Sequence, residues 1–141
     1  MSLSQVGAQG FDQLAFWAIN IVKEKGYDIK NIVYVPFKGQ ELRWSEYGLF
    51  SQREYRLMLK LADEVVYLYN IDAKDYKSVV KALYGRNHAM CNDVDLVIGL
   101  YKDLSFRTER KSGTAECLRY AESIKKHILL FDKDTYAVTE L

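Results

Sequence analysis

The sequence predicts an α/β fold, a three-layer sandwich built on a mainly parallel sheet of about four to five strands with helices on both faces. Short apolar runs rich in β-branched and aromatic residues are typical of strands buried on both faces. Segments with helical periodicity separate these runs, as the right-handed crossovers of parallel sheets require. No repeat, proline-rich linker or change in composition divides residues 1–141, so we expect a single domain.

Four apolar runs predict the main strands, and a shorter run near the carboxyl end predicts an edge strand. They lie at residues 32–37, 65–69, 96–101 and 128–131, with the edge strand at residues 136–139. All are within the usual length of strands in globular proteins.

Four helices are expected between these strands. The first begins near Asp12 and ends at Gly26, the second begins at Ser51, the third covers residues 75–90, and the fourth begins at Ser112. Helical spacing predicts which side chains point inward. These are Leu14, Trp17, Ala18, Ile21 and Val22 in the first helix, Tyr55, Met58, Leu59 and Ala62 in the second, Tyr76, Val79, Val80 and Leu83 in the third, and Ala115, Leu118, Ala121 and Ile124 in the fourth.

Charge and composition restrict the function classes. Twenty Lys and Arg against 19 Asp and Glu give a net charge of +1, which argues against a nucleic-acid binder that works by bulk charge and leaves a local basic patch as the alternative. No apolar run approaches the ~20 residues that span a bilayer. The amino-terminal residues lack the pattern of a signal peptide. We therefore expect a cytoplasmic protein that does not bind membranes.

The cysteine count argues against structural metal or disulfide chemistry. Cys91 and Cys117 are the two cysteines, with no C-x-x-C motif and no paired histidine nearby. We expect both to be reduced, half-buried core residues, and we expect no metal and no cofactor.

Two long loops follow predicted strands, at residues 38–50 and 102–112. In open α/β sheets, ligands bind at the carboxyl ends of strands, which is where such loops emerge. Trp44, Tyr47 and Phe106 lie in these loops. Their rings could stack on a base or pack against the sheet, and the sequence leaves both readings open.

The first candidate site precedes the first helix and consists of Gly7, Ala8, Gly10 and Asp12. Glycines before a helix allow backbone N–H groups to approach an anion, which the helix dipole also favours. A tight turn with Asp12 as the helix cap explains the same residues.

The second candidate site is the stretch Arg107-Thr-Glu-Arg-Lys-Ser-Gly-Thr114, directly before the fourth helix. Gly113 and Thr114 offer backbone donors, Ser112 and Thr114 offer hydroxyls, and Arg110 offers a guanidinium, which together suit a phosphate group. A solvated loop with an ordinary cap is the alternative.

A third candidate is Arg86-Asn87, late in the third helix, with His88 beside it. These residues could reach a ligand over the strand ends. They could equally stabilise the carboxyl end of the helix, where a cation is favoured.

In order along the chain, these motifs resemble the SLOG superfamily of Rossmann-like proteins, especially its YpsA-like branch. The motifs are G-A-x-G-x-D, a strand ending in Pro-Phe, R-N-x-x-M, D-x-D before a strand, and S-G-T-A-E at a helix start, and the resemblance spans residues 4–131. It implies a Rossmann-like three-layer sandwich and a nucleotide or nucleotide-derived ligand. The site residues it implies are Gly7, Ala8, Gly10, Asp12, Gly113 and Thr114, with Arg86 and Asn87 nearby.

The Lonely Guy phosphoribohydrolases are similar around residues 110–117, but the match is partial. Their Pro-Gly-Gly is absent, and the position of their catalytic Glu falls on Cys117, with Glu116 one residue early. One step along a helix turns a side chain by about 100°, which argues against copying their reaction.

The amino terminus also departs from the family. Relatives begin with a strand, a Thr-Gly-His-Arg-like turn and a helix, whereas this chain starts almost at the G-A-x-G-x-D turn. We expect either a naturally short member or a truncated chain that lacks the first strand and helix. An uncovered sheet edge would then favour a homodimer.

The leading functional hypothesis is a sensor or effector that binds a nucleotide-derived ligand without catalysis. The alternative is an enzyme that cleaves the N-glycosidic bond of a nucleoside monophosphate, with Arg86 stabilising charge and Glu116, Asp12 or Asp93 as the carboxylate. A DNA-processing module is a third, less favoured hypothesis because it needs a continuous basic groove. A fold that has lost its ligand explains the same pattern.

Overall fold

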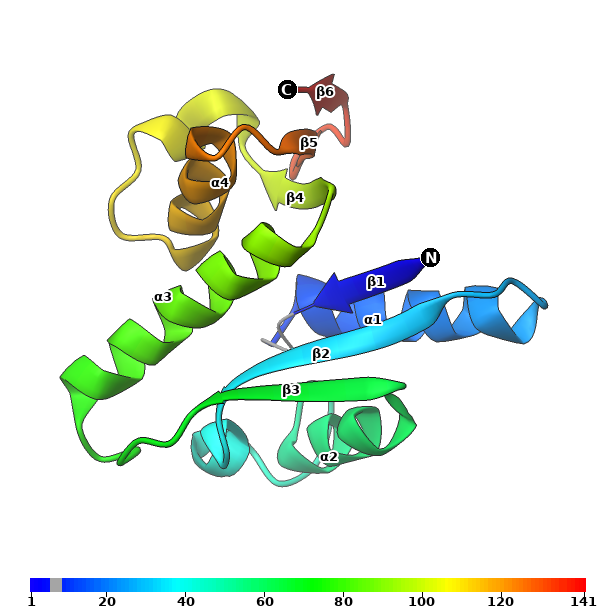
Figure 1. Cartoon of the computed structure of the whole chain (residues 1–141), viewed down its shortest axis with the longest axis vertical. Coiled ribbons are helices and arrows are strands. Elements are labelled where there is room, and N and C mark those ends of the chain that lie inside the picture. The colour runs from blue at the N-terminus through cyan, green and yellow to red at the C-terminus, as the bar shows by residue number, and fades with distance from the viewer. Residues whose placement is uncertain (6–8) are drawn as a thin grey trace. The chain divides into compact units, whose positions relative to one another are not determined.

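The computed structural model describes residues 1–5 and 9–141, in which helices and strands alternate along the chain (Figure 1). The α/β fold class is confirmed, and five of the strands join in parallel pairs. The chain divides into two compact units, Met1–Arg86 and Asn87–Leu141. The single domain expected from the sequence stays a prediction.

The first unit contains a parallel three-stranded sheet in the order β1-β2-β3. Its elements are β1 (Ser2–Gln5), α1 (Phe11–Glu24), β2 (Lys30–Phe37), the short 3-10 helix η1 (Gln40–Arg43), α2 (Gln52–Leu61) and β3 (Glu64–Tyr69). The sequence predicted β2, β3 and both α-helices. It missed β1, whose four residues, Ser-Leu-Ser-Gln, include a single apolar side chain and carry no strand signal.

The core of the first unit lies between the sheet and two helices. Phe16 of α1 and Tyr55 and Met58 of α2 pack with Val33 and Val35 of β2, and all five are almost completely buried. Both helices therefore cover the same face of the sheet. The inward face predicted for α2 is confirmed, and the hydroxyl of its cap residue Ser51 accepts a hydrogen bond from the Glu54 N–H at 3.2 Å.

The inward face predicted for α1 is wrong except at Trp17, which packs against the core of the first unit. Leu14 and Ile21 are 54% and 55% exposed, whereas Gln13 and Phe16 are buried. The helix turns a mixed face to the sheet because the sheet presents a polar residue, Asn31, at this point. Hydrophobic spacing cannot register such a contact, since it counts polar residues as solvent-facing.

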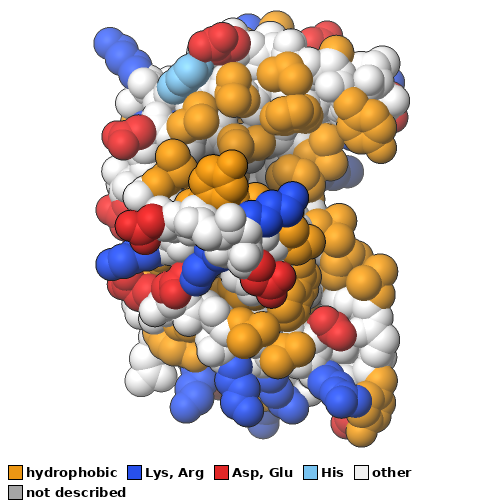
Figure 2. Space-filling view, turned by 90° about the vertical axis from the view of Figure 1, so that its right-hand side faces the viewer, with side chains coloured by type: hydrophobic (Ala, Val, Ile, Leu, Met, Phe, Trp, Pro, Cys, Tyr) orange, Lys and Arg blue, Asp and Glu red, His pale blue; other side chains and the backbone are white. Residues whose placement is uncertain are grey.

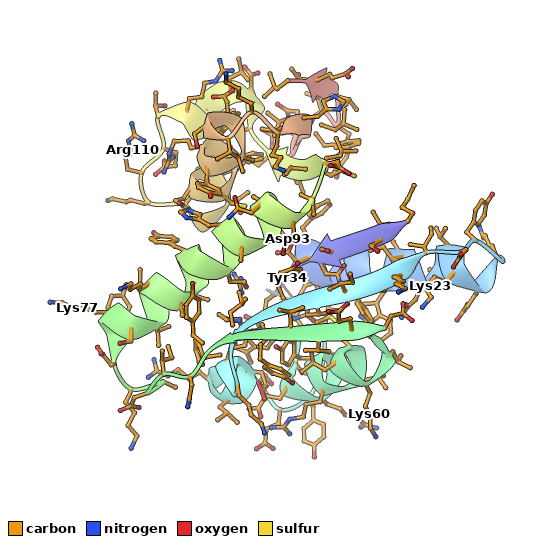
Figure 3. The ribbon with its side chains drawn as sticks, viewed as in Figure 1. Lys23, Tyr34, Lys60, Lys77, Asp93 and Arg110 are labelled. Atoms are coloured by element: carbon orange, nitrogen blue, oxygen red, sulfur yellow. The ribbon has the colours of Figure 1, made fainter. Side chains whose placement is uncertain are left out.

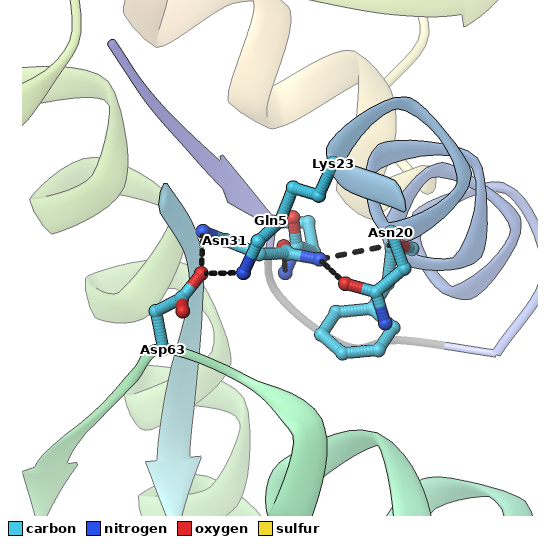
Figure 4. Close-up of polar contacts among 6 residues, drawn as sticks. Gln5, Asn20, Lys23, Asn31 and Asp63 are labelled. Atoms are coloured by element: carbon cyan, nitrogen blue, oxygen red, sulfur yellow. Dashed lines mark hydrogen bonds and ion pairs between the residues drawn. The ribbon is translucent and has the colours of Figure 1, made fainter. Parts of the chain in front are cut away.

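Asn31 is completely buried and is the centre of a polar network (Figure 4). Its side-chain N–H groups donate to the Phe16 carbonyl and to Asn20 Oδ1, both at 3.1 Å, and its Oδ1 accepts from Gln5 Nε2 at 2.8 Å. Its backbone N–H donates to Asp63 Oδ2 at 2.7 Å. One side chain thus joins β1, α1 and β2 by hydrogen bonds in a dry environment, where such bonds count most.

The second unit contains β4 (Leu96–Tyr101), the 3-10 helix η2 (Asp103–Arg107), α4 (Gly113–Ser123), β5 (His127–Asp132) and β6 (Val138–Glu140). β4 and β5 pair in parallel, and β6 pairs antiparallel with β5. Its core includes Cys91, Phe106 and the inner face of α4, which is Ala115, Leu118 and Ala121 as predicted. Gly99 of β4 allows α4 to pack closely, because a Cβ there would lie 2.7 Å from Leu118 Cδ2.

The remaining helix, α3 (Tyr76–Asp93), belongs to both units, since the division falls between Arg86 and Asn87. In the first unit its Gly85 makes room for the ring of Tyr69, whose hydroxyl would lie 2.1 Å from a Cβ at that position. Among the helices described, none combines the length and the apolar character needed to cross a membrane.

Apolar side chains also reach the surface (Figure 2). Phe11 and Leu14 of α1 and Tyr67 of β3 are among the large ones, each more than two-fifths exposed. Isolated exposed apolar residues are normal in folded proteins. The homodimer expected from the sequence stays a prediction.

Candidate functional site

The first predicted site residues lie at the start of α1. Gly10 caps the helix with φ 98° and ψ −126°, a conformation that side chains disfavour, and its carbonyl accepts from the Leu14 N–H at 3.1 Å. Asp12 follows in the first helical turn. Gly7 and Ala8 lie outside the described residues. The glycine at position 10 is therefore required by the backbone, whether or not a ligand binds.

Asp12 and Arg86 form the charged part of the first unit's site. Burial raises the pKa of Asp12 from 3.8 to about 6, and the nearby positive charge of Arg86 opposes that increase. Arg86 itself is 5% exposed. A buried guanidinium beside a partly buried carboxyl is costly to place, and such arrangements are enriched at functional sites.

The loop at residues 38–50 contacts both Arg86 and the residues just before α1. Gln9 Nε2 donates to the Phe50 carbonyl at 2.7 Å, and Arg86 Nη1 donates to Gln40 Oε1 at 3.4 Å. Gln40 in turn donates to the Tyr55 hydroxyl at 2.7 Å. The structure thus brings the first candidate segment, Arg86 and the first long loop together within one unit.

Gln40 and Tyr55 are site residues that sequence reasoning missed. Burial raises the pKa of Tyr55 above its ordinary value of 10.0, at which the hydroxyl is already protonated at neutral pH. Gln40 lies in the loop at residues 38–50, whose length suggests a function, but nothing in the sequence distinguishes Gln40 from the other polar residues of that loop. The apolar spacing of α2 predicts that Tyr55 is a core residue.

The aromatic residues of the long loops differ in their environments. Trp44 packs edge-on against Tyr55, with ring centroids 5.1 Å apart, and Phe106 is completely buried. Tyr47 is 68% exposed. Core packing therefore accounts for Trp44 and Phe106, and Tyr47 is the one of the three that solvent reaches freely.

The second candidate segment lies at the start of α4 in the second unit. Ser112 caps the helix, and its hydroxyl accepts from the Ala115 N–H at 3.2 Å. Gly113 and Thr114 are exposed in the first turn, and Arg110 projects outward from the loop before it (Figure 3). The cap leaves the first backbone N–H groups of the helix accessible, which is the arrangement that anions bind.

Fewer cations of the basic stretch before α4 can bind an anion than the sequence suggests. Arg107 pairs with Glu122, with its Nη2 2.6 Å from Glu122 Oε2. The Glu109 carboxylate accepts from the backbone N–H of Lys111 at 2.7 Å, a bond that does not involve the Lys111 ammonium. Arg110 and Lys111, both exposed, are therefore the cations of this stretch that fit the predicted role.

Further residues of the second unit surround Glu116. One carboxylate oxygen of Glu116 contacts His88 Nε2, and the other is buried with no hydrogen bond to any described residue. The His88 ring stacks on Tyr120, with centroids 3.7 Å apart. Asn87 is 7% exposed. His88 is thus a contact of a candidate residue rather than a simple helix cap.

Comparison with known proteins identifies the family. A model of the YspA SLOG family matches residues 3–136, nearly the whole chain. This chain belongs to the YspA SLOG family. Among the relatives of this SLOG domain is the uncharacterized SPbeta prophage-derived protein YoqJ of Bacillus subtilis (strain 168), 33% identical over 122 residues. That match covers 82% of this chain and 66% of YoqJ, so the chain spans slightly less than two thirds of its relative.

Proposed function

We propose that this protein binds a nucleotide or nucleotide-derived ligand and acts as a sensor or effector. The observation that carries the proposal is the buried Arg86 beside Asp12 and Gln40, close to the start of α1. Membership of the SLOG family supports the same class of ligand.

The chemistry of this cluster suits a phosphorylated ligand. A guanidinium offers several donors in a fixed plane, which match the oxygens of a phosphate. The amino end of α1 adds backbone N–H groups and a favourable dipole. The polar side chain of Gln40 offers a further hydrogen bond to a sugar or base, and the buried Tyr55 hydroxyl, which accepts from Gln40 Nε2, holds that amide in place.

The start of α4, in the second unit, is a separate candidate phosphate site. Gly113 and Thr114 carry the exposed N–H groups, and Arg110 supplies the positive charge. The Ser112 hydroxyl already accepts a bond from its own helix, so we assign it to positioning that first turn.

Thermal denaturation with and without ligand tests the proposal. The full chain is screened with AMP, ATP, NAD, ADP-ribose, cyclic nucleotides and inorganic phosphate. A ligand at 100 times its Kd stabilises the folded state by about 2.7 kcal/mol, which raises Tm by several degrees. If no nucleotide changes Tm, the proposal is wrong for this chain.

If a ligand raises Tm, two variants identify the residues that bind it. Arg86→Lys keeps the charge but loses the planar donors, and we expect the Kd of a phosphorylated ligand to rise about tenfold or more. Arg110→Gln tests the second segment in the same way. Lys77→Gln removes one exposed charge from the amino end of α3 and serves as the control, with an unchanged Kd expected.

Glu116 gives the enzymatic alternative its specific support. Its carboxylate has one oxygen on His88 and another without a hydrogen bond, as an unliganded general acid or base could have. Chromatography of each nucleotide mixture for released base tests for cleavage. Under this alternative Glu116→Gln abolishes release, whereas Glu140→Gln, which alters the exposed His127–Glu140 pair, does not.

A further inference from the structure

The two cysteines of the chain lie against each other in the second unit. Cys91 Sγ on α3 is 3.6 Å from Cys117 Sγ on α4, a hydrogen-bond distance for sulfur. Both are thiols, although they are far apart in the sequence and no motif links them. Folding of this unit therefore places two oxidisable groups side by side.

The two Sγ atoms need to move only a short distance to form a covalent bond. A disulfide needs about 2.05 Å between its sulfur atoms, so the two must approach by roughly 1.5 Å. Cys91 belongs to the same buried core cluster as Ala115 and Ala121, two small residues of α4. A side-chain rotation at the partly exposed Cys117 is the least costly way to close the gap.

The surroundings of Cys91 favour its thiolate form. The hydrogen bond from Cys117 lowers the pKa of Cys91, and the positive charge of Lys126 acts in the same direction, while burial and the Glu116 carboxylate oppose it. A thiolate is the species that attacks a disulfide. Cys117 is partly exposed to solvent, whereas Cys91 is completely buried.

We propose that Cys91 and Cys117 form a reversible disulfide by exchange with a low-molecular-weight disulfide. The Cys117 thiolate attacks one sulfur of the small disulfide, which forms a mixed disulfide and releases one small thiolate. The Cys91 thiolate then attacks Cys117 Sγ and releases the second. Two protein thiols are oxidised, one small disulfide is reduced to two thiols, and the two cysteine protons go to the released thiolates.

The bond would cross-link α3 to α4 beside Glu116. Cys117 follows Glu116 directly, and Cys91 lies one helical turn after His88 on α3. Oxidation would therefore fix the two helices that carry the His88–Glu116 contact. It would also close a long loop, which stabilises a fold by restricting the unfolded chain.

The test uses the full reduced chain, incubated with mixtures of oxidised and reduced glutathione and then alkylated under denaturing conditions. Mass spectrometry should find a monomer that has lost two hydrogens and resists alkylation, with Cys91 and Cys117 joined in one linked peptide pair. Its Tm should rise by roughly 5–15 °C and return on reduction.

Cys117→Ser is the control, because it keeps a small polar side chain at this partly exposed position and removes one partner. It should form no internal cross-link, and its Tm should not respond to the oxidant. Recovery of two alkylated thiols from the oxidised wild-type chain would overturn the proposal. So would oxidation that stops at a mixed disulfide or that joins two chains.

Discussion

Arg86 acts on the carboxyl of Asp12 across the first unit, and its positive charge limits a pKa that burial has raised to about 6. The two residues belong to different helices, α3 and α1. In the unfolded chain Asp12 titrates near its ordinary value of 3.8, so between these two pH values the folded chain binds more protons.

Asp12→Asn should stabilise the protein at neutral pH. A carboxyl group whose pKa is higher in the folded than in the unfolded chain lowers the free energy of unfolding as pH rises from the unfolded pKa to the folded pKa. Above the folded pKa the loss is complete. The variant should match wild type below about pH 4 and exceed it by about 3 kcal/mol above about pH 7. Urea unfolding at several pH values measures this. A difference that does not change with pH would contradict the raised pKa, and Asp28→Asn is the exposed control.

Asp63 should show the opposite dependence. Its carboxylate accepts from Lys23 Nζ and from the Asn31 N–H, and these bonds lower its pKa, with the Lys23 bond the larger cause. The stabilisation is present above the unfolded pKa and disappears as pH falls through the folded one. Because the pair is partly exposed, we expect Asp63→Asn to cost about 0.5–1 kcal/mol at pH 7. Unfolding measured again near pH 2 should find the two proteins equal, and a deficit that persists there would point to a different cause.

Gly99→Ala should disturb the second core. The new Cβ would meet the almost completely buried Leu118 side chain at 2.7 Å, and the helix or the rotamer must shift. We expect a loss of about 1–3 kcal/mol in the free energy of unfolding. Gly113→Ala has no atom within 4 Å of its Cβ and should be neutral or slightly stabilising in a helix. Equal losses for the two variants would argue against close packing of α4 on β4.

Asn31→Ala should be the most damaging of the polar substitutions. It removes hydrogen bonds to three residues and leaves buried groups of Gln5 and Phe16 without those partners. The expected loss is about 2–4 kcal/mol. Asn20→Ala, which removes one of the bonds at a half-buried position, should cost clearly less, as denaturant unfolding of both variants can establish.

The α/β class, four strands and the inward faces of α2 and α4 could be predicted because each rests on local apolar spacing. β1 and the buried side of α1 could not, since Gln5, Gln13 and Asn31 are polar residues that folding buries. The family motifs led to Asp12 and Arg86. The contact of Arg86 with Gln40, and that of Cys91 with Cys117, depend on long-range packing that no local pattern records.

The Asn31 network also has a consequence for the internal motions of the first unit. α1 cannot lift from the sheet without breaking the bonds of Asn31 to Phe16 and Asn20, and its departure exposes to water the Asn31 side chain that also binds Gln5 of β1. The two segments should therefore open as one cooperative unit rather than fray separately. Amide hydrogens of the middle of α1 and of β1 would then exchange with deuterium at a common opening free energy.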